Sequence, residues 1–133
     1  MNAEVAAPPL VQRLVDVHGA CWIDQTNLQD FTKGDGARVL FFCGDPIRVA
    51  EGLDVAVVLP ELRAALGQDF VIGAVRGTCE DDIARRFGVQ RWPSLVFFRD
   101  GDYITTLAGM YDWNDYLERV QQALVMPPSR KPG

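Results

Sequence analysis

Hydrophobic residues along this chain follow two patterns, one typical of helices and one typical of buried strands. Continuous apolar runs at 38–43 and 70–75, each bounded by turn residues, predict strands that are buried on both faces. Between them, apolar residues at helical spacing from 55 to 66 predict a helix, in which Pro60 should cause a kink or mark the first turn. Two buried strands joined by a helix form a parallel pair with a right-handed crossover.

Shorter patterns and turn residues predict the remaining elements. In chain order these are a helix at 10–15 that stops at Gly19, an edge strand at 21–23, a short helix at 26–31, a helix that begins at 78 and ends at Gly88, a β-hairpin of strands 94–98 and 103–107, and a final helix after Asp112. Thr26, Thr78 and Asp112 are the expected N-caps, because their side-chain oxygens can accept hydrogen bonds from free backbone N–H groups. The final helix should bury Trp113, Tyr116, Leu117, Val120 and Leu124.

This order of elements predicts an α/β fold in a single domain. A central mixed sheet, with a C-terminal β-hairpin, should carry helices on both faces. The domain should span 9–125, between a flexible N-terminus at 1–8 and a flexible tail at 126–133 that has little to bury. The sequence contains neither an internal repeat nor an interior linker.

Composition excludes several kinds of partner. The 133 residues are 48% hydrophobic and include 13 basic and 18 acidic residues, a net charge of -5, so there is no electrostatic footprint for nucleic acid or anionic membrane. No apolar stretch is long enough for membrane insertion, and the N-terminus lacks the pattern of a secretory signal. We therefore expect a cytoplasmic protein; the charge does not decide its oligomeric state.

The chain carries few residues typical of catalytic or metal sites. Its three cysteines, Cys21, Cys43 and Cys79, form no Cys-x-x-Cys pair, and His18 is the single histidine. These spacings support neither a disulfide framework nor a zinc site. A glycine-rich phosphate loop, a nucleophile elbow and a His-Glu metal motif are also missing. We predict no cofactor, no metal and no catalytic residue.

Residues 70–124 resemble the thioredoxin superfamily in the order of their elements and in the segments Phe87-Gly88-Val89 and Arg91-Trp92-Pro93-Ser94. The resemblance implies a thioredoxin-like fold in which Pro93 is a cis-proline beside the site that receives an extended peptide. Where the family carries Trp-Cys-Gly-Pro-Cys, this chain has Phe42-Cys43-Gly44-Asp45-Pro46 and then several extra residues. Dithiol exchange needs a second thiol within reach, so redox catalysis is not expected.

The missing redox pair, the extra residues at 46–54 and the segment from Arg86 to Phe97 are similar to the hydrogenase expression/formation proteins of the HupG/HyaE type. This resemblance covers roughly residues 10–125. It implies a chaperone-like accessory role in the maturation of uptake [NiFe] hydrogenase. The implied partner is the hydrogenase small-subunit precursor with its twin-arginine signal peptide.

On such a fold, loops that meet at one edge of the sheet form the candidate site. The predicted peptide- or partner-binding residues are Gly44, Asp45, Glu51, Asp54, Trp92, Pro93, Met110 and Tyr111. Methionine and aromatic side chains around a proline-fixed loop suit an extended peptide, although Trp92 and Met110 also suit ordinary packing. The acidic members are candidates to pair with arginines of the peptide.

Alternative interpretations remain open for the acidic residues at 80–82, for the Cys43 thiol and for the function. Glu80, Asp81 and Asp82 form a possible secondary acidic patch, but stabilisation of the helix dipole already explains acids at a helix start. Cys43 is either a small buried hydrophobic residue or the reactive group of a single-thiol redox protein. Besides a hydrogenase accessory protein and a single-thiol redox protein, a degenerate thioredoxin-fold adaptor for another protein is the third functional alternative.

Overall fold

The computed structural model describes residues 7–130, so 1–6 and 131–133, the outer parts of the two predicted flexible ends, lie outside the described residues. The elements are α1 (Pro9–Asp16), β1 (Cys21–Ile23), α2 (Leu28–Thr32), β2 (Ala37–Phe42), α3 (Glu51–Leu66), β3 (Val71–Val75), the 3-10 turn η1 (Gly77–Cys79), α4 (Glu80–Arg86), β4 (Ser94–Arg99), β5 (Asp102–Ala108) and α5 (Trp113–Val125). Within 7–130, no helix is both long and apolar enough to cross a membrane.

The five strands form one mixed sheet in the order β1-β3-β2-β4-β5. β2 and β3, which α3 connects as a crossover helix, pair in parallel, and β1 pairs in parallel with the other side of β3. β4 pairs antiparallel with β2, and β5 completes the C-terminal hairpin. The predicted α/β fold with its mixed sheet is therefore confirmed.

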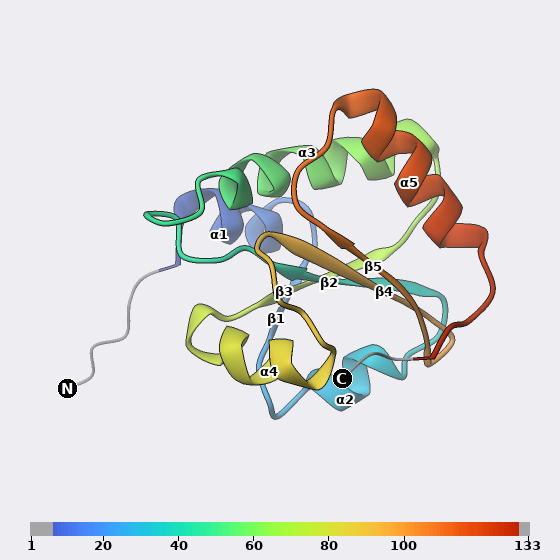
Figure 1. Ribbon diagram of the computed structural model, residues 1–133, viewed down its shortest axis with the longest axis horizontal. Coiled ribbons are helices and arrows are strands. Elements are labelled where there is room, and N and C mark those ends of the chain that lie inside the picture. Colours follow the sequence, from blue (N-terminus) through green and yellow to red (C-terminus); the bar gives the residue numbers. More distant parts are fainter. Residues whose placement is uncertain (1–6, 131–133) are drawn as a thin grey trace.

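Helices cover both faces of the sheet, as Figure 1 shows, with α1, α3 and α5 on one face and α2 and α4 on the other. The alternation of side chains along the central strand explains this arrangement. Val39 and Phe41 of β2 face the first helix layer, while Leu40 and Phe42 face the second, and all four are fully buried. A strand that is buried on both faces has a continuous run of apolar residues, and this run predicted β2 from the sequence.

The predicted caps were wrong in two cases. α2 begins after Asn27 rather than Thr26, because the Asn27 side chain ties the preceding loop together, accepting from the Asp24 N–H (2.9 Å) and donating to the Trp22 carbonyl (2.9 Å). α4 begins after Cys79, because η1 occupies the position at which Thr78 was expected to cap it. Asp112 is the N-cap residue of α5, but its side chain makes no capping hydrogen bond.

Two predictions about the longer helices are now decided. Pro60 lies inside α3 and not in its first turn, because the helix already begins at Glu51. The extra residues at 46–54 are therefore partly a turn, in which the N–H groups of Arg48 and Val49 bond to the Asp45 carbonyl, and partly the start of α3. Trp113 was expected in the core but is 41% exposed, since it is the first residue of α5.

The last described residues run back along the start of β5. The backbone N–H of Ser129 donates to the carbonyl of Tyr103 (2.9 Å), and the Arg99 guanidinium holds the carbonyls of Leu124 and Met126 at 3.1 and 2.8 Å. The register between β4 and β5 also shifts between Phe97 and Phe98. The free edge of β5 is thus partly occupied where the strand begins.

The first turn of α3 packs directly on the end of β2, and Gly52 makes this approach possible. A Cβ at position 52 would collide with the carbonyl oxygen of Cys43 and lie 2.9 Å from its Sγ. We expect Gly52→Ala to lower the free energy of unfolding by about 1–3 kcal/mol, the usual cost of overpacking. Urea denaturation measures this change.

The matched control is Gly77→Ala, where a Cβ would meet no atom within 4 Å. That substitution should be neutral or slightly stabilising, because alanine restricts the unfolded chain. Equal effects of the two substitutions would contradict the close contact at Gly52.

Candidate functional site

Three loops meet at one end of the sheet. Figure 1 shows that β2 ends there, that β4 begins there and that β5 ends there. The Trp92–Pro93 peptide bond that precedes β4 is cis, as the resemblance implied. The Gly109 N–H after β5 donates to the Pro93 carbonyl at 2.7 Å, which joins two of the loops and brings Met110 close to the proline.

A buried carboxylate joins the third loop to the same place. Glu80, at the start of α4, is 7% exposed and accepts hydrogen bonds from the Gly44 N–H at 3.1 and 3.2 Å and from the Trp92 indole N–H at 2.9 Å. We call these three residues the Glu80 clamp. Through the clamp, the loop after β2 and the loop before β4 are held by one side chain.

Glu80 therefore does not contribute to the possible secondary acidic patch with Asp81 and Asp82, because its carboxylate is buried. Its two neighbours are not buried in the same way, and Asp82 pairs with Arg85 and accepts a hydrogen bond from Gln25 (3.3 Å). A signal in the sequence distinguishes Glu80 from these neighbours. Counting from Glu80, the buried residues Ile83, Ala84 and Phe87 follow at i+3, i+4 and i+7, so the carboxylate shares the apolar face of α4.

The electrostatics of the site follow from this burial. Removal from water raises the pKa of Glu80 from 4.5 to about 7, although the hydrogen bonds from Gly44 and Trp92 act in the opposite direction. Burial, and then the nearby charge of Glu80, raise the pKa of the Cys43 thiol to about 12. A thiolate is the reactive form of cysteine, so Cys43 is held in its unreactive form.

Gly44 is needed for the close approach of the two loops. Its φ is +84°, a conformation that side chains disfavour, and a Cβ there would lie 3.0 Å from the Cβ of Trp92. The predicted site residue Gly44 thus belongs to the clamp because of its backbone conformation and its close contact with Trp92.

The other apolar members of the predicted site differ in exposure. Pro93 is buried, Trp92 is half-buried and Met110 is 38% exposed. Tyr111 packs edge-on against Tyr116 with ring centroids 5.2 Å apart, and its hydroxyl donates to the Ala108 carbonyl at 2.8 Å. Its contacts are those of an ordinary packed tyrosine.

Asp45, Glu51 and Asp54 are exposed, and none of them forms an ion pair within residues 7–130. The Asp45 carboxylate accepts the Ile47 N–H at 3.0 Å, which shapes the loop. Glu51 and Asp54 lie in the first turn of α3, where acids stabilise the helix dipole. The structure thus supplies a folding reason for these two acids that the sequence did not reveal.

Unpaired groups and exposed apolar side chains lie beside the clamp. Within the described chain, the backbone N–H and C=O of Trp92 have no hydrogen-bond partner. Ile47, three residues after Gly44, is 93% exposed. Residues 7–130 contain no group of three or more His, Cys, Asp or Glu residues that could hold a metal ion. The site therefore offers backbone pairing and apolar contact.

The burial of Glu80 makes the stability of the protein depend on pH. Because the pKa of folded Glu80 lies above its ordinary value, the folded state binds the proton more tightly than the unfolded state. The resulting stabilisation is complete below about pH 4.5 and is lost as the pH rises to about 7. Relative to Glu80→Gln, the wild type should lose on the order of 3 kcal/mol of unfolding free energy across this range, measured by urea denaturation at several pH values.

The control is Glu118→Gln, which removes an exposed glutamate of α5. This variant should keep the pH dependence of the wild type. A Glu80→Gln variant that also kept it would show that Glu80 titrates as an exposed carboxyl.

Comparison with known proteins supports one family. The family model of the hydrogenase-1 expression protein HyaE matches residues 10–116. The hydrogenase expression/formation protein HoxO of Cupriavidus necator is 50% identical over 130 residues, which cover 96% of this chain and 81% of the relative. HupG of Rhodobacter capsulatus is 38% identical over 117 residues, covering 87% and 85%.

Solved structures agree. A crystal structure of the putative hydrogenase expression/formation protein HupG from Rhodopseudomonas palustris matches with a TM-score of 0.55 and 34% identity, covering 78% of this chain and 94% of that one. A mutant thioredoxin from Halobacterium salinarum matches with a TM-score of 0.65 over 82% and 94% of the two chains, and at 21% identity it shows the fold alone. The chain therefore has a thioredoxin-like fold and belongs to the HyaE family of hydrogenase expression/formation proteins.

Proposed function

We propose that this protein is a non-catalytic, chaperone-like accessory protein of the cytoplasm. It holds the small-subunit precursor of an uptake [NiFe] hydrogenase during assembly and binds the twin-arginine signal peptide of that precursor. Membership of the HyaE family supports the link to hydrogenase formation. The client is the one that resemblance to this family implies, and the proposed mode of binding rests on the features of the Glu80 clamp and its surroundings.

The unpaired backbone of Trp92 is the observation that carries this proposal. An extended peptide can pair with the free N–H and C=O of Trp92 as an added strand does. The clamp fixes the tryptophan side chain through Glu80, so little flexibility is lost when a peptide pairs with its backbone. The exposed side chains of Ile47 and Met110 supply apolar contact next to this position.

Carboxylates near the clamp suit the arginines of a signal peptide. Asp45 directly follows Gly44, and Asp54 lies one helical turn beyond the exposed Glu51. A guanidinium forms its strongest and most directional hydrogen bonds with carboxylates. These three acids have no cation partner within residues 7–130, so they are free to accept one.

A redox function of the single thiol has less support. The Cys43 side chain is 5% exposed, and its pKa is raised to about 12. Pro46 stands at the position where a second cysteine would complete a Cys-x-x-Cys pair. Attack on a disulfide requires an accessible thiolate, and Cys43 provides neither access nor charge.

The first test is titration calorimetry with the small-subunit signal peptide and a version in which glutamine replaces both arginines. The arginine peptide should bind at micromolar or tighter affinity, and the glutamine peptide at least about ten-fold more weakly. A double variant, Asp45→Asn with Asp54→Asn, should lose a similar factor. Asp102→Asn, an exposed acid at the start of β5, is the matched control and should bind as the wild type does.

Equal binding of the two peptides would contradict a role for the acids in recognising arginine. Absence of binding to either would contradict the signal peptide as the ligand and leave the mature region of a precursor, or an unrelated protein, as the client.

The second test compares the cysteines. Because burial hides the Cys43 sulfur and raises its pKa, we expect it to react with iodoacetamide at least about a hundred-fold more slowly than the exposed Cys21 of the same molecule. Mass spectrometry of the native protein measures both rates. Replacing all three cysteines with alanine should leave peptide binding intact, whereas rapid alkylation of Cys43 would favour the redox alternative.

A further inference from the structure

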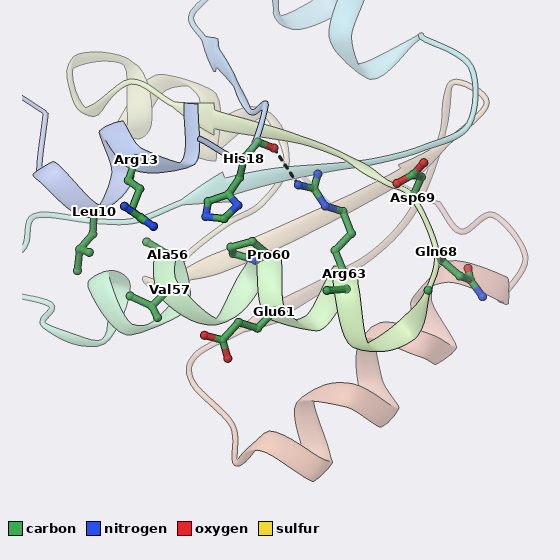
Figure 2. A pocket seen from close by; sticks show the side chains of 12 residues that line it. Leu10, Arg13, His18, Ala56, Val57, Pro60, Glu61, Arg63, Gln68 and Asp69 are labelled. Atoms are coloured by element: carbon green, nitrogen blue, oxygen red, sulfur yellow. Dashed lines mark hydrogen bonds between the residues drawn. The ribbon is translucent and has the colours of Figure 1, made fainter. Parts of the chain in front are cut away.

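A second concave surface lies between α1 and the outer side of α3. Figure 2 shows this cleft, which has a volume of about 880 Å³ and shares no residue with the Glu80 clamp. Its floor is the face of α3 formed by Ala56, Val57, Pro60 and Ala64, and Leu10 of α1 borders it. Val57 is 43% exposed and Leu10 is 37% exposed, so apolar surface faces the solvent here.

Arg63 fixes the wall of the cleft. Its guanidinium donates to the carbonyl of His18 at 2.8 Å and to the carbonyl of Phe70 at 3.1 Å, and it lies 5.9 Å from the centre of the Phe70 ring. These bonds tie the segment after α1 and the segment after α3 to the body of α3. The cleft is therefore formed without a ligand, and a ligand would not have to order it.

The guanidinium of Arg13 and the imidazole ring of His18 face the same end of the cleft. Figure 2 shows the Arg13 side chain pointing from α1 toward Ala56, and the His18 ring beside Pro60. Within the described residues, neither side chain makes a hydrogen bond or an ion pair. Of the acids that line the cleft, Glu61 extends from the outer side of α3, and Asp69 lies at the far end beyond Arg63. Arg13 and Arg63 balance Glu61 and Asp69 over the lining as a whole, so the positive charge at the end near Leu10 is that of Arg13.

The shape of the cleft favours a peptide over a compact anion. The lining follows α3 from Ala56 to the end of the helix at Leu66, which gives a length of about 15 Å at the helical rise per residue, and it continues into the loop to Asp69. An extended segment of about five residues has this length. Phosphate or another small anion would contact Arg13 and His18 and leave the apolar floor uncovered.

We propose that this cleft binds an acidic segment of a partner protein. A carboxylate of the segment pairs with Arg13 and accepts a hydrogen bond from His18, and a neighbouring apolar side chain covers Val57 and Pro60. An unpaired guanidinium recognises a carboxylate through two parallel hydrogen bonds, which gives both affinity and orientation. Because the two surfaces share no residue, the cleft can be occupied whichever client binds at the Glu80 clamp.

The test is an NMR titration of the ¹⁵N-labelled protein with a blocked hexapeptide of alternating leucine and glutamate. Matched peptides carry glutamine or lysine in place of glutamate. Amide shifts should change at Leu10, Arg13, Val57 and Ala64, and the glutamine and lysine peptides should bind at least about ten-fold more weakly. Binding of the glutamate peptide should weaken with added salt.

Arg13→Glu should weaken the glutamate peptide at least about ten-fold and should restore binding of the lysine peptide. Lys33→Glu makes the same change of charge at the end of α2, on the other face of the sheet, and should leave binding unchanged.

Several outcomes would overturn the proposal. One is the absence of shift changes at peptide concentrations up to about 1 mM, where only weak binding would remain. Others are equal binding of all three peptides, and shift changes at Gly44 and Trp92 in place of the cleft. The last is inorganic phosphate that competes as strongly as the glutamate peptide. Concentration-dependent shifts at the cleft without peptide would identify a second copy of the chain as the occupant.

Discussion

The site depends on one buried carboxylate. Glu80 is taken out of water, and this cost is offset only because the Gly44 N–H and the Trp92 indole N–H donate to it. Those donors come from two loops far apart in the sequence, so the carboxylate fixes the distance between them. The positive φ of Gly44 and the position of the Trp92 ring are both parts of the same arrangement.

The same carboxylate also determines the chemistry of the neighbouring thiol. Burial alone would disfavour the thiolate of Cys43, and the charge of Glu80 disfavours it further. Gly52 completes the enclosure, because its backbone occupies the space next to the sulfur. The same scaffold exposes a reactive thiolate in dithiol oxidoreductases. Here it encloses a neutral thiol.

The sequence predicted the fold because apolar periodicity reports burial directly. The continuous run in β2 and the Asp-Gly hairpin are local signals, and both appear in the structure at nearly the predicted bounds. The caps were less predictable, since Thr26 and Thr78 have suitable side chains but η1 and the Asn27 loop displace them. Trp113 is apolar and correctly spaced, yet its position at the helix end leaves it partly uncovered.

The candidate site was predicted only in part, because its central group is polar. Gly44, Trp92 and Pro93 could be placed by the resemblance to thioredoxins, and they do lie together. Glu80 precedes two further acids, so composition gave no reason to single it out, and the signal that separates it from them is its helical spacing to Ile83 and Ala84. Its partners are 36 and 12 residues away, and only the assembled sheet brings these groups within hydrogen-bond distance.

The two edges of the sheet bear on whether the protein pairs with further copies of itself. A free strand edge is a template for further strands, including those of other copies of the same protein. Here β1, at the opposite edge, has only three residues, while β5 has a register shift beside it and the Ser129 N–H on its Tyr103 carbonyl. Self-assembly through either edge of the sheet is thereby disfavoured, and the peptide pairing proposed at Trp92 does not compete with it.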